Sequence, residues 1–262
     1  MPTLNTYFAQ VFRAEEELKA AVRQQLPGAI SVDELLLDAN GVGGALVQLM
    51  LDFALPTYER LEAVGFAFAQ EVNGAPVQQP RGTAVAEGLR KLHEAATATV
   101  GKFLIDFTRL SAGMLDSGME PDAVRQALQV QLANPLALGP VFSSLVQGLA
   151  AAAASGVQVV GNQAMLASLT ATPGAPDIDD AVWVWLTVHD SRVCPDCGKR
   201  HNVKRTLAEW VALGEPRSGW SVCGDRCRCV IMPDKYVDDE IDLTVPITMS
   251  RDAVLATITR RT

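Results

Sequence analysis

Apolar side chains recur at steps of three and four residues along most of the first 170 positions. This spacing places them on one face of an α-helix, and it predicts helices over residues 5–26, 45–72, 84–115 and 121–133. The alternation of apolar and polar residues that marks a strand is scarce here. We therefore predict a mainly α fold, in which residues 1–172 form a helical body suited to assembly or oligomerisation.

Three local signals mark starts and interruptions within this body. Ser31 and Glu34 have the spacing of a capping box before a short helical run. The GVGG segment at residues 41–44 lacks the Gly-Lys-Ser/Thr ending of a phosphate-binding loop, so we interpret it as a turn. Pro56 is expected to break the second helical region, because proline removes a backbone donor and crowds the preceding turn.

No charged residue occurs from position 126 to position 176. An apolar span of this length can cross a bilayer. However, glutamine and asparagine interrupt it, much of its apolar content is alanine, and no basic flank marks a cytoplasmic side. Small residues at close intervals permit tight contact between helices. We expect a helix buried within the fold or between subunits, with membrane contact as the alternative.

The last ninety or so residues have a different pattern. Residues 170–180 are typical of a linker, and the VWVWLTV segment that follows has the branched and aromatic residues of a strand. The CVIMP segment predicts a second short strand that can pair with the first. Between them, Thr206 and Glu209 predict a capped short helix. Residues 173–262 are therefore expected to form a small α+β module with an acidic tail.

All five cysteines of the chain lie in this module, and the first two form the sequence Cys194-Pro-Asp-Cys197-Gly198. Two residues between cysteines let both sulfurs face one metal ion, while backbone NH groups of the turn point at the thiolates. We expect Gly198 to adopt the positive φ that closes such a turn.

A second cysteine cluster follows about 25 residues later, which is the layout of a four-ligand structural zinc site. We predict one structural Zn²⁺ per chain. Cys194 and Cys197 are the safest ligands and Cys227 is the next. The remaining place is left open between Cys223, Cys229 and His201.

Other uses of these thiols fit the sequence less well. A disulfide pair is weakened by the odd number of cysteines and by an N-terminus without the layout of a signal peptide. A redox CxxC site would need a thioredoxin-like βαβ pattern, which is not seen. His189 beside Asp190 suggests a Cys-His hydrolase, but a mostly thiolate metal site is normally closed. We expect no enzyme activity, and we expect Asp190 and Arg192 to orient the first cysteine turn.

The charge balance limits the partners. The net charge of −8 and the sequence pI near 4.9 disfavour general nucleic-acid binding, which needs a basic surface. A local basic cluster does occur, and we interpret it as a surface loop rather than a DNA site. Its members are Lys199, Arg200, Lys204 and Arg205.

The residues around the cysteines resemble the C-terminal motif of phage Mu F-like minor head proteins, also called head morphogenesis proteins. In that family a Trp precedes Asp-x-Arg-Val-Cys-x-x-Cys, and a loop leads to His-Pro-x-Cys-Arg-Cys. The residues that match are Trp185, Asp190, Arg192, Val193, Cys194, Cys197, Cys227, Arg228 and Cys229. The family histidine is absent, and Cys223-Gly-Asp-Arg stands in its place.

This resemblance, which covers about fifty residues, implies a structural virion protein that acts in capsid assembly near the portal. It implies binding to the portal protein and other head proteins, in multiple copies per particle, with no specific nucleic acid. The implied location is the virion head, and the host cytoplasm during assembly. The alternative is a zinc-stapled module that recognises nucleic acid or a cellular protein. A third reading, a toxin or enzyme domain, would need an extra segment that is not visible.

Overall fold

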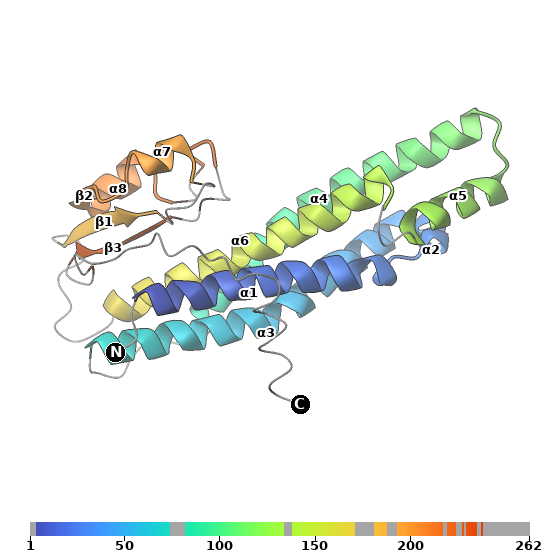
Figure 1. The fold of residues 1–262 in the computed structure, drawn as a ribbon. Helices are drawn as coiled ribbons and strands as arrows, with labels where there is room; N and C mark the ends of the chain where they lie inside the picture. Colours follow the sequence, from blue (N-terminus) through green and yellow to red (C-terminus); the bar gives the residue numbers. More distant parts are fainter. Residues whose placement is uncertain are drawn as a thin grey trace, which may run out of the picture. The chain divides into compact units, whose positions relative to one another are not determined.

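The computed structural model describes most of the chain and shows a mainly α fold. Leaving aside residues 1–9, the chain divides between residues 175 and 176 into two compact units. The first is helical, and the second contains three strands and the cysteines (Figure 1). The predicted fold class is confirmed. The described residues are 4–73, 82–133, 138–170, 181–187, 193–216, 219–223, 227, 229–234 and 237.

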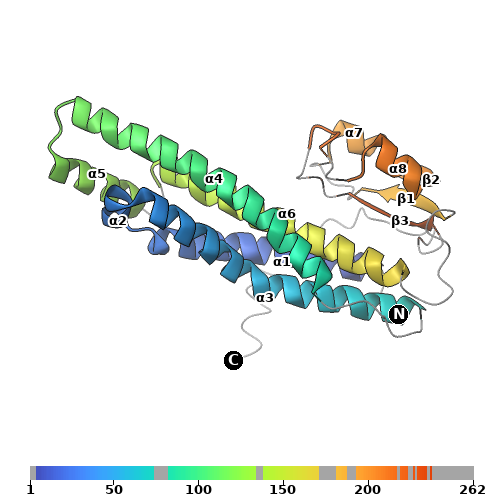
Figure 2. The same ribbon diagram turned by 180° about the vertical axis from the view of Figure 1, so that it is seen from behind.

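Four long helices form most of the described helical unit and lie side by side (Figure 1, Figure 2). The unit also contains a short 3-10 helix at Leu26–Ala29 and the short helices α2 and α5, which contact each other. The predicted helices near residues 5–26, 84–115 and 121–133 are confirmed. The α-helices are α1 Leu4–Gln25, α2 Val32–Leu37, α3 Ala39–Asn73, α4 Thr83–Asp116, α5 Pro121–Ala133 and α6 Pro140–Thr170.

The charge-free run supplies α6, which packs against both α3 and α4. Its middle turns are fully buried at Leu149, Ala153, Val157 and Val160. Over Pro140–Met165 it is also the one helix among the described residues that is long and apolar enough to cross a membrane, and 56% of its most apolar stretch is buried within the protein. Burial among neighbouring helices accounts for an apolar sequence of this kind without a bilayer.

Glycines allow α6 to approach α3 closely. A Cβ atom on Gly65 of α3 would lie 2.7 Å from the Cβ of Ala164 and 3.1 Å from the carbonyl carbon of that residue. Further along, the ring of Tyr58 fills the space above Gly156, and its hydroxyl donates to the Ala153 carbonyl at 3.0 Å. The small residues of α6 therefore provide close helix contact, and a buried tyrosine fixes its position along α3.

The predicted turn at residues 41–44 is wrong, because this segment lies inside α3. Asp38 precedes the helix, and its Oδ1 accepts a hydrogen bond from the Gly41 amide at 3.0 Å. Such a cap satisfies one of the free NH groups at a helix start. A Cβ on Gly43 would lie 2.9 Å from the Leu104 side chain of α4. At least one of these glycines thus serves helix packing rather than chain reversal.

The predicted break at Pro56 is also wrong, since α3 continues through this residue. A proline inside a helix removes one backbone hydrogen bond and costs about 3 kcal/mol or more. Ala54 and Tyr58 on either side of it are fully buried. Their contacts within the bundle hold both halves of α3 in line, so tertiary packing overrides the local signal.

A buried carboxylate fixes the start of α4. Glu62 of α3 is 5% exposed, and its two oxygens accept hydrogen bonds from the amides of Gly82, Ala84 and Val85 at 2.7, 3.0 and 3.4 Å. These amides have no partner within the helix, and the helix dipole favours a negative charge there. Glu62 therefore joins the end of the α3–α4 connection to the bundle core.

The second unit is built on an antiparallel sheet with strand order β2-β1-β3. The strands are β1 Val182–Leu186, β2 Lys204–Thr206 and β3 Val230–Pro233. The predicted pairing of the VWVWLTV and CVIMP segments is confirmed. The predicted capping box is also present, at the start of α8 Leu207–Leu213. The short strand β2, with two exposed basic residues, was not predicted.

The close contact between α3 and α6 predicts that alanine has opposite effects on stability at two glycines. Gly65→Ala should destabilise the helical unit by about 1–3 kcal/mol, because backbone atoms of α6 block the new methyl group. Gly101→Ala is the control, since a Cβ there meets nothing within 4 Å, and it should stabilise α4 by up to about 1 kcal/mol. Urea unfolding followed by far-UV circular dichroism measures both. Equal effects of the two variants would contradict the close approach.

Candidate metal centre

The sheet register brings the two cysteine segments to the same place. Leu186, the last residue of β1, pairs with Val230, the first residue of β3. The segment that follows β1 and the segment that precedes β3 therefore meet the sheet at the same end. Cys194 and Cys197 follow β1, while Cys227 and Cys229 precede β3. Strand pairing alone thus directs thiols that are 30 residues apart toward one another.

The first cysteine pair lies on a single helical turn, α7 Pro195–Gly198. Cys194 caps this turn, and its sulfur accepts from the Cys197 amide at 3.4 Å. This NH-to-sulfur contact is the one that the CxxC spacing predicts.

The positive φ predicted for Gly198 is wrong, because Gly198 is the last helical residue of α7. The left-handed residue is Asn202, with a φ of 60°. Its amide donates to the Trp185 carbonyl at 2.8 Å, which returns the chain to β1. Asparagine tolerates this conformation better than most residues do, so the reversal falls a few residues later than the CxxC motif suggests.

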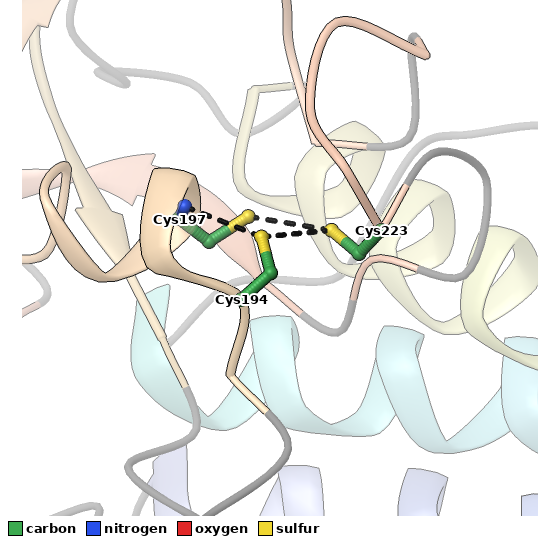
Figure 3. A group of neighbouring side chains, drawn as sticks. All are labelled: Cys194, Cys197 and Cys223. Atoms are coloured by element: carbon green, nitrogen blue, oxygen red, sulfur yellow. Dashed lines mark hydrogen bonds between the residues drawn. The ribbon is translucent and has the colours of Figure 1, made fainter.

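The sulfur atoms form two overlapping triads, the first of which is shown in Figure 3. Cys194 Sγ lies 3.4 Å from Cys223 Sγ, and Cys197 Sγ lies 3.5 Å from the sulfurs of both Cys223 and Cys227. All sulfurs of a triad lie within 4.8 Å of one another. The triads are Cys194, Cys197 and Cys223, and Cys197, Cys227 and Cys229. All five predicted cysteines are therefore brought together, with Cys197 common to both groups.

Burial differs across the cluster. Cys197, Cys227 and Cys229 are at most 3% exposed, whereas Cys194 and Cys223 are half-buried. The segment that carries Cys223 is tied to α7 by a hydrogen bond from the Val222 amide to Asp196 Oδ2 at 3.1 Å. The cluster thus has a buried side toward β3 and a more accessible side at the α7 turn.

The ionisation of the thiols is strongly uneven. A hydrogen bond from Cys229 lowers the pKa of Cys227 to about 5. Burial and the neighbouring Cys227 raise the pKa of Cys197, and the hydrogen bond to Cys227 raises that of Cys229. Thiolates this close together repel one another, so they cannot all ionise without a cation. Sulfur-rich sites of this kind favour soft or borderline metals, and the cluster can hold a metal ion.

His201, which the sequence offers as a possible metal ligand, contacts Thr187, the residue that follows β1. His201 Nδ1 accepts from the Thr187 amide at 3.2 Å and lies 3.1 Å from the hydroxyl of the same residue. Among the described residues, neither sulfur triad includes a histidine. His189, Asp190, Arg192 and Arg228 lie outside the described residues.

Arg200 of the basic cluster makes contacts that the sequence does not indicate. Its guanidinium carbon lies 3.3 Å from the ring centroid of Trp220, 5.0 Å from that of Trp185 and 5.5 Å from that of Trp210. A planar guanidinium over aromatic faces is a cation–π contact. Burial lowers the pKa of Arg200. Arg200 lies in a partly exposed turn, as the surface-loop interpretation predicts, but its side chain also packs against the tryptophans.

The same guanidinium also closes the end of α8. It donates to the carbonyls of Leu213 and Gly214 at 2.8 and 2.6 Å. These groups lack partners within the helix and carry the negative end of its dipole. Arg200 therefore links the loop after the CxxC turn to α8 and to the tryptophans. The spacing of the sequence contains no signal for such a contact.

Comparison with known proteins adds no identification. No family model, no curated protein and no solved structure matches the chain. The assignment of a role therefore depends on the residues themselves.

The contacts of Arg200 predict how stable the second unit is, the one with the sheet and the cysteines, which is called the small unit below. Arg200→Lys keeps the charge but loses the flat face and the forked donors, so it should destabilise this unit by about 1–3 kcal/mol. Arg205→Lys is the matched control, because Arg205 is exposed, its ion pair with Glu209 is long at 3.9 Å, and its guanidinium carbon lies 5.8 Å from the Trp210 ring, near the outer limit of a cation–π contact. Urea unfolding followed by tryptophan fluorescence measures both variants. A control loss as large as that of Arg200→Lys would contradict the account.

Proposed function

We propose that this chain is a structural phage virion protein, a minor head protein that acts in capsid assembly near the portal. In this proposal its C-terminal unit is held by a structural zinc centre. The chain works by binding the portal protein and other head proteins rather than by catalysis. The observation that carries the proposal is the cysteine motif, whose members Cys194, Cys197, Cys227 and Cys229 belong to one sulfur cluster.

The size of the small unit supports a structural role for the metal. Its sheet has only three described strands, each of three to five residues. Sheets this small have little core of their own, and small domains often depend on a metal or disulfides. A thiolate-held ion can fix a contact surface in one geometry. Zinc suits the donors present, because it binds cysteine thiolates tetrahedrally in structural sites.

The charge and composition of the chain support protein partners over DNA. A net charge of −8 repels the phosphate backbone. Head assembly instead requires contacts between proteins, and these do not depend on a basic surface. The competing proposal, a zinc-stapled module that recognises nucleic acid or a cellular protein, shares the metal centre and differs in its partner.

Particle incorporation tests the proposal. Cys194→Ser removes a thiol from the cluster and should reduce incorporation of the protein into particles at least several-fold. Ala208→Ser is an equally small change at an exposed position of α8, and it should leave incorporation unchanged. Particles and assembly intermediates from phage carrying each form are purified and probed for this protein beside the portal. If the wild-type protein is absent from both, the head-protein proposal fails and the binding-module proposal replaces it.

A further inference from the structure

The arrangement of the sulfurs does not match one tetrahedral ion. Four thiolates about 2.3 Å from a zinc ion lie about 3.8 Å from one another. In the cluster, Cys197 is near all the others of both triads and Cys223 also contacts Cys227, but Cys194 and Cys229 each belong to one triad. Among the described Cys, His, Asp and Glu residues, no group of four has all its ligand atoms within 4.8 Å.

We propose that the cluster binds two divalent thiophilic cations that share the Cys197 thiolate. One ion is held by Cys194, Cys197 and Cys223, and the other by Cys197, Cys227 and Cys229. This inference rests on the metal centre of the proposed function and goes beyond the single ion that the sequence predicts. Cys197 has the geometry of a bridge, because its sulfur lies 3.5 Å from one member of each triad, Cys223 and Cys227.

The number of cysteines fits this arrangement. Two triads with one shared member need five thiols, which is the number in the chain. If all five thiols ionise, one divalent ion leaves a net charge of about −3 and two ions reduce it to about −1. Three of the sulfurs belong to residues that are at most 3% exposed, Cys197, Cys227 and Cys229. Uncompensated charge is costly in such a place, so a second cation stabilises the ionised cluster.

The two ions would make different connections within the small unit. The first joins the α7 turn to the segment that carries Cys223, which Asp196 already contacts through the Val222 amide. The second joins the same turn to the residues that enter β3. Together the two ions would tie the α7 turn, through Cys197, to both of the later cysteine segments. A single ion held by either triad would leave the other connection to packing.

The test counts bound ions on the full chain. Metal-stripped protein is titrated with Cd²⁺ under reducing conditions and examined by native mass spectrometry, with cadmium NMR to detect coupling through a shared sulfur. We expect two ions per wild-type chain and two mutually coupled signals. Cys229→Ser and Cys194→Ser should each retain one ion, because each variant leaves one triad intact. Cys197→Ser should bind neither ion as tightly.

The outcomes separate this inference from the proposal on which it rests. Saturation of the wild-type chain at one ion, with Cys229→Ser also binding one, would overturn the two-ion cluster and leave a single metal centre. Binding of no ion would overturn the metal centre itself. The wild-type count decides the question even if a cysteine variant fails to fold.

Discussion

The meeting of sulfur atoms at Cys197 is the contact on which the small unit depends. Its sheet pairs Leu186 with Val230, and this register delivers one cysteine segment after β1 and another before β3. Sulfurs 3.5 Å apart then face one another in a largely buried space. Without a cation the thiols cannot all ionise, whereas thiolates bound to one would cross-link the sheet to its loops. Strand pairing therefore brings together thiols that could hold a metal ion, and a bound ion would in turn support the pairing.

The two units of the chain are stabilised in different ways. The helical unit uses close packing at glycines, a buried tyrosine hydroxyl and the Glu62 carboxylate at the start of α4. These contacts need no cofactor. The small unit has short strands and relies on a sulfur cluster together with Arg200 stacked among tryptophans. A unit held by a few strong contacts can keep a rigid surface, which suits the proposed role of binding other proteins.

Much of the fold could be predicted from the sequence because its signals are local. Helical periodicity, the Thr206 capping box and the cysteine spacing each depend on residues a few positions apart. The errors arose where distant contacts decide the outcome. Gly43 packs against Leu104 of another helix, and the helix continues through Pro56 because its neighbours are buried. The contact of Arg200 with three tryptophans is likewise invisible to any short pattern.

The position of the tryptophans allows a direct measurement of the central claim, that bound metal holds the small unit together. All four tryptophans of the chain lie in that unit, while most of the described helix lies in the other. Removing the metal with a chelator under reducing conditions should shift the tryptophan emission to the red and leave far-UV circular dichroism nearly unchanged, with recovery on adding Zn²⁺. Unchanged tryptophan emission after verified removal of the metal would contradict the account.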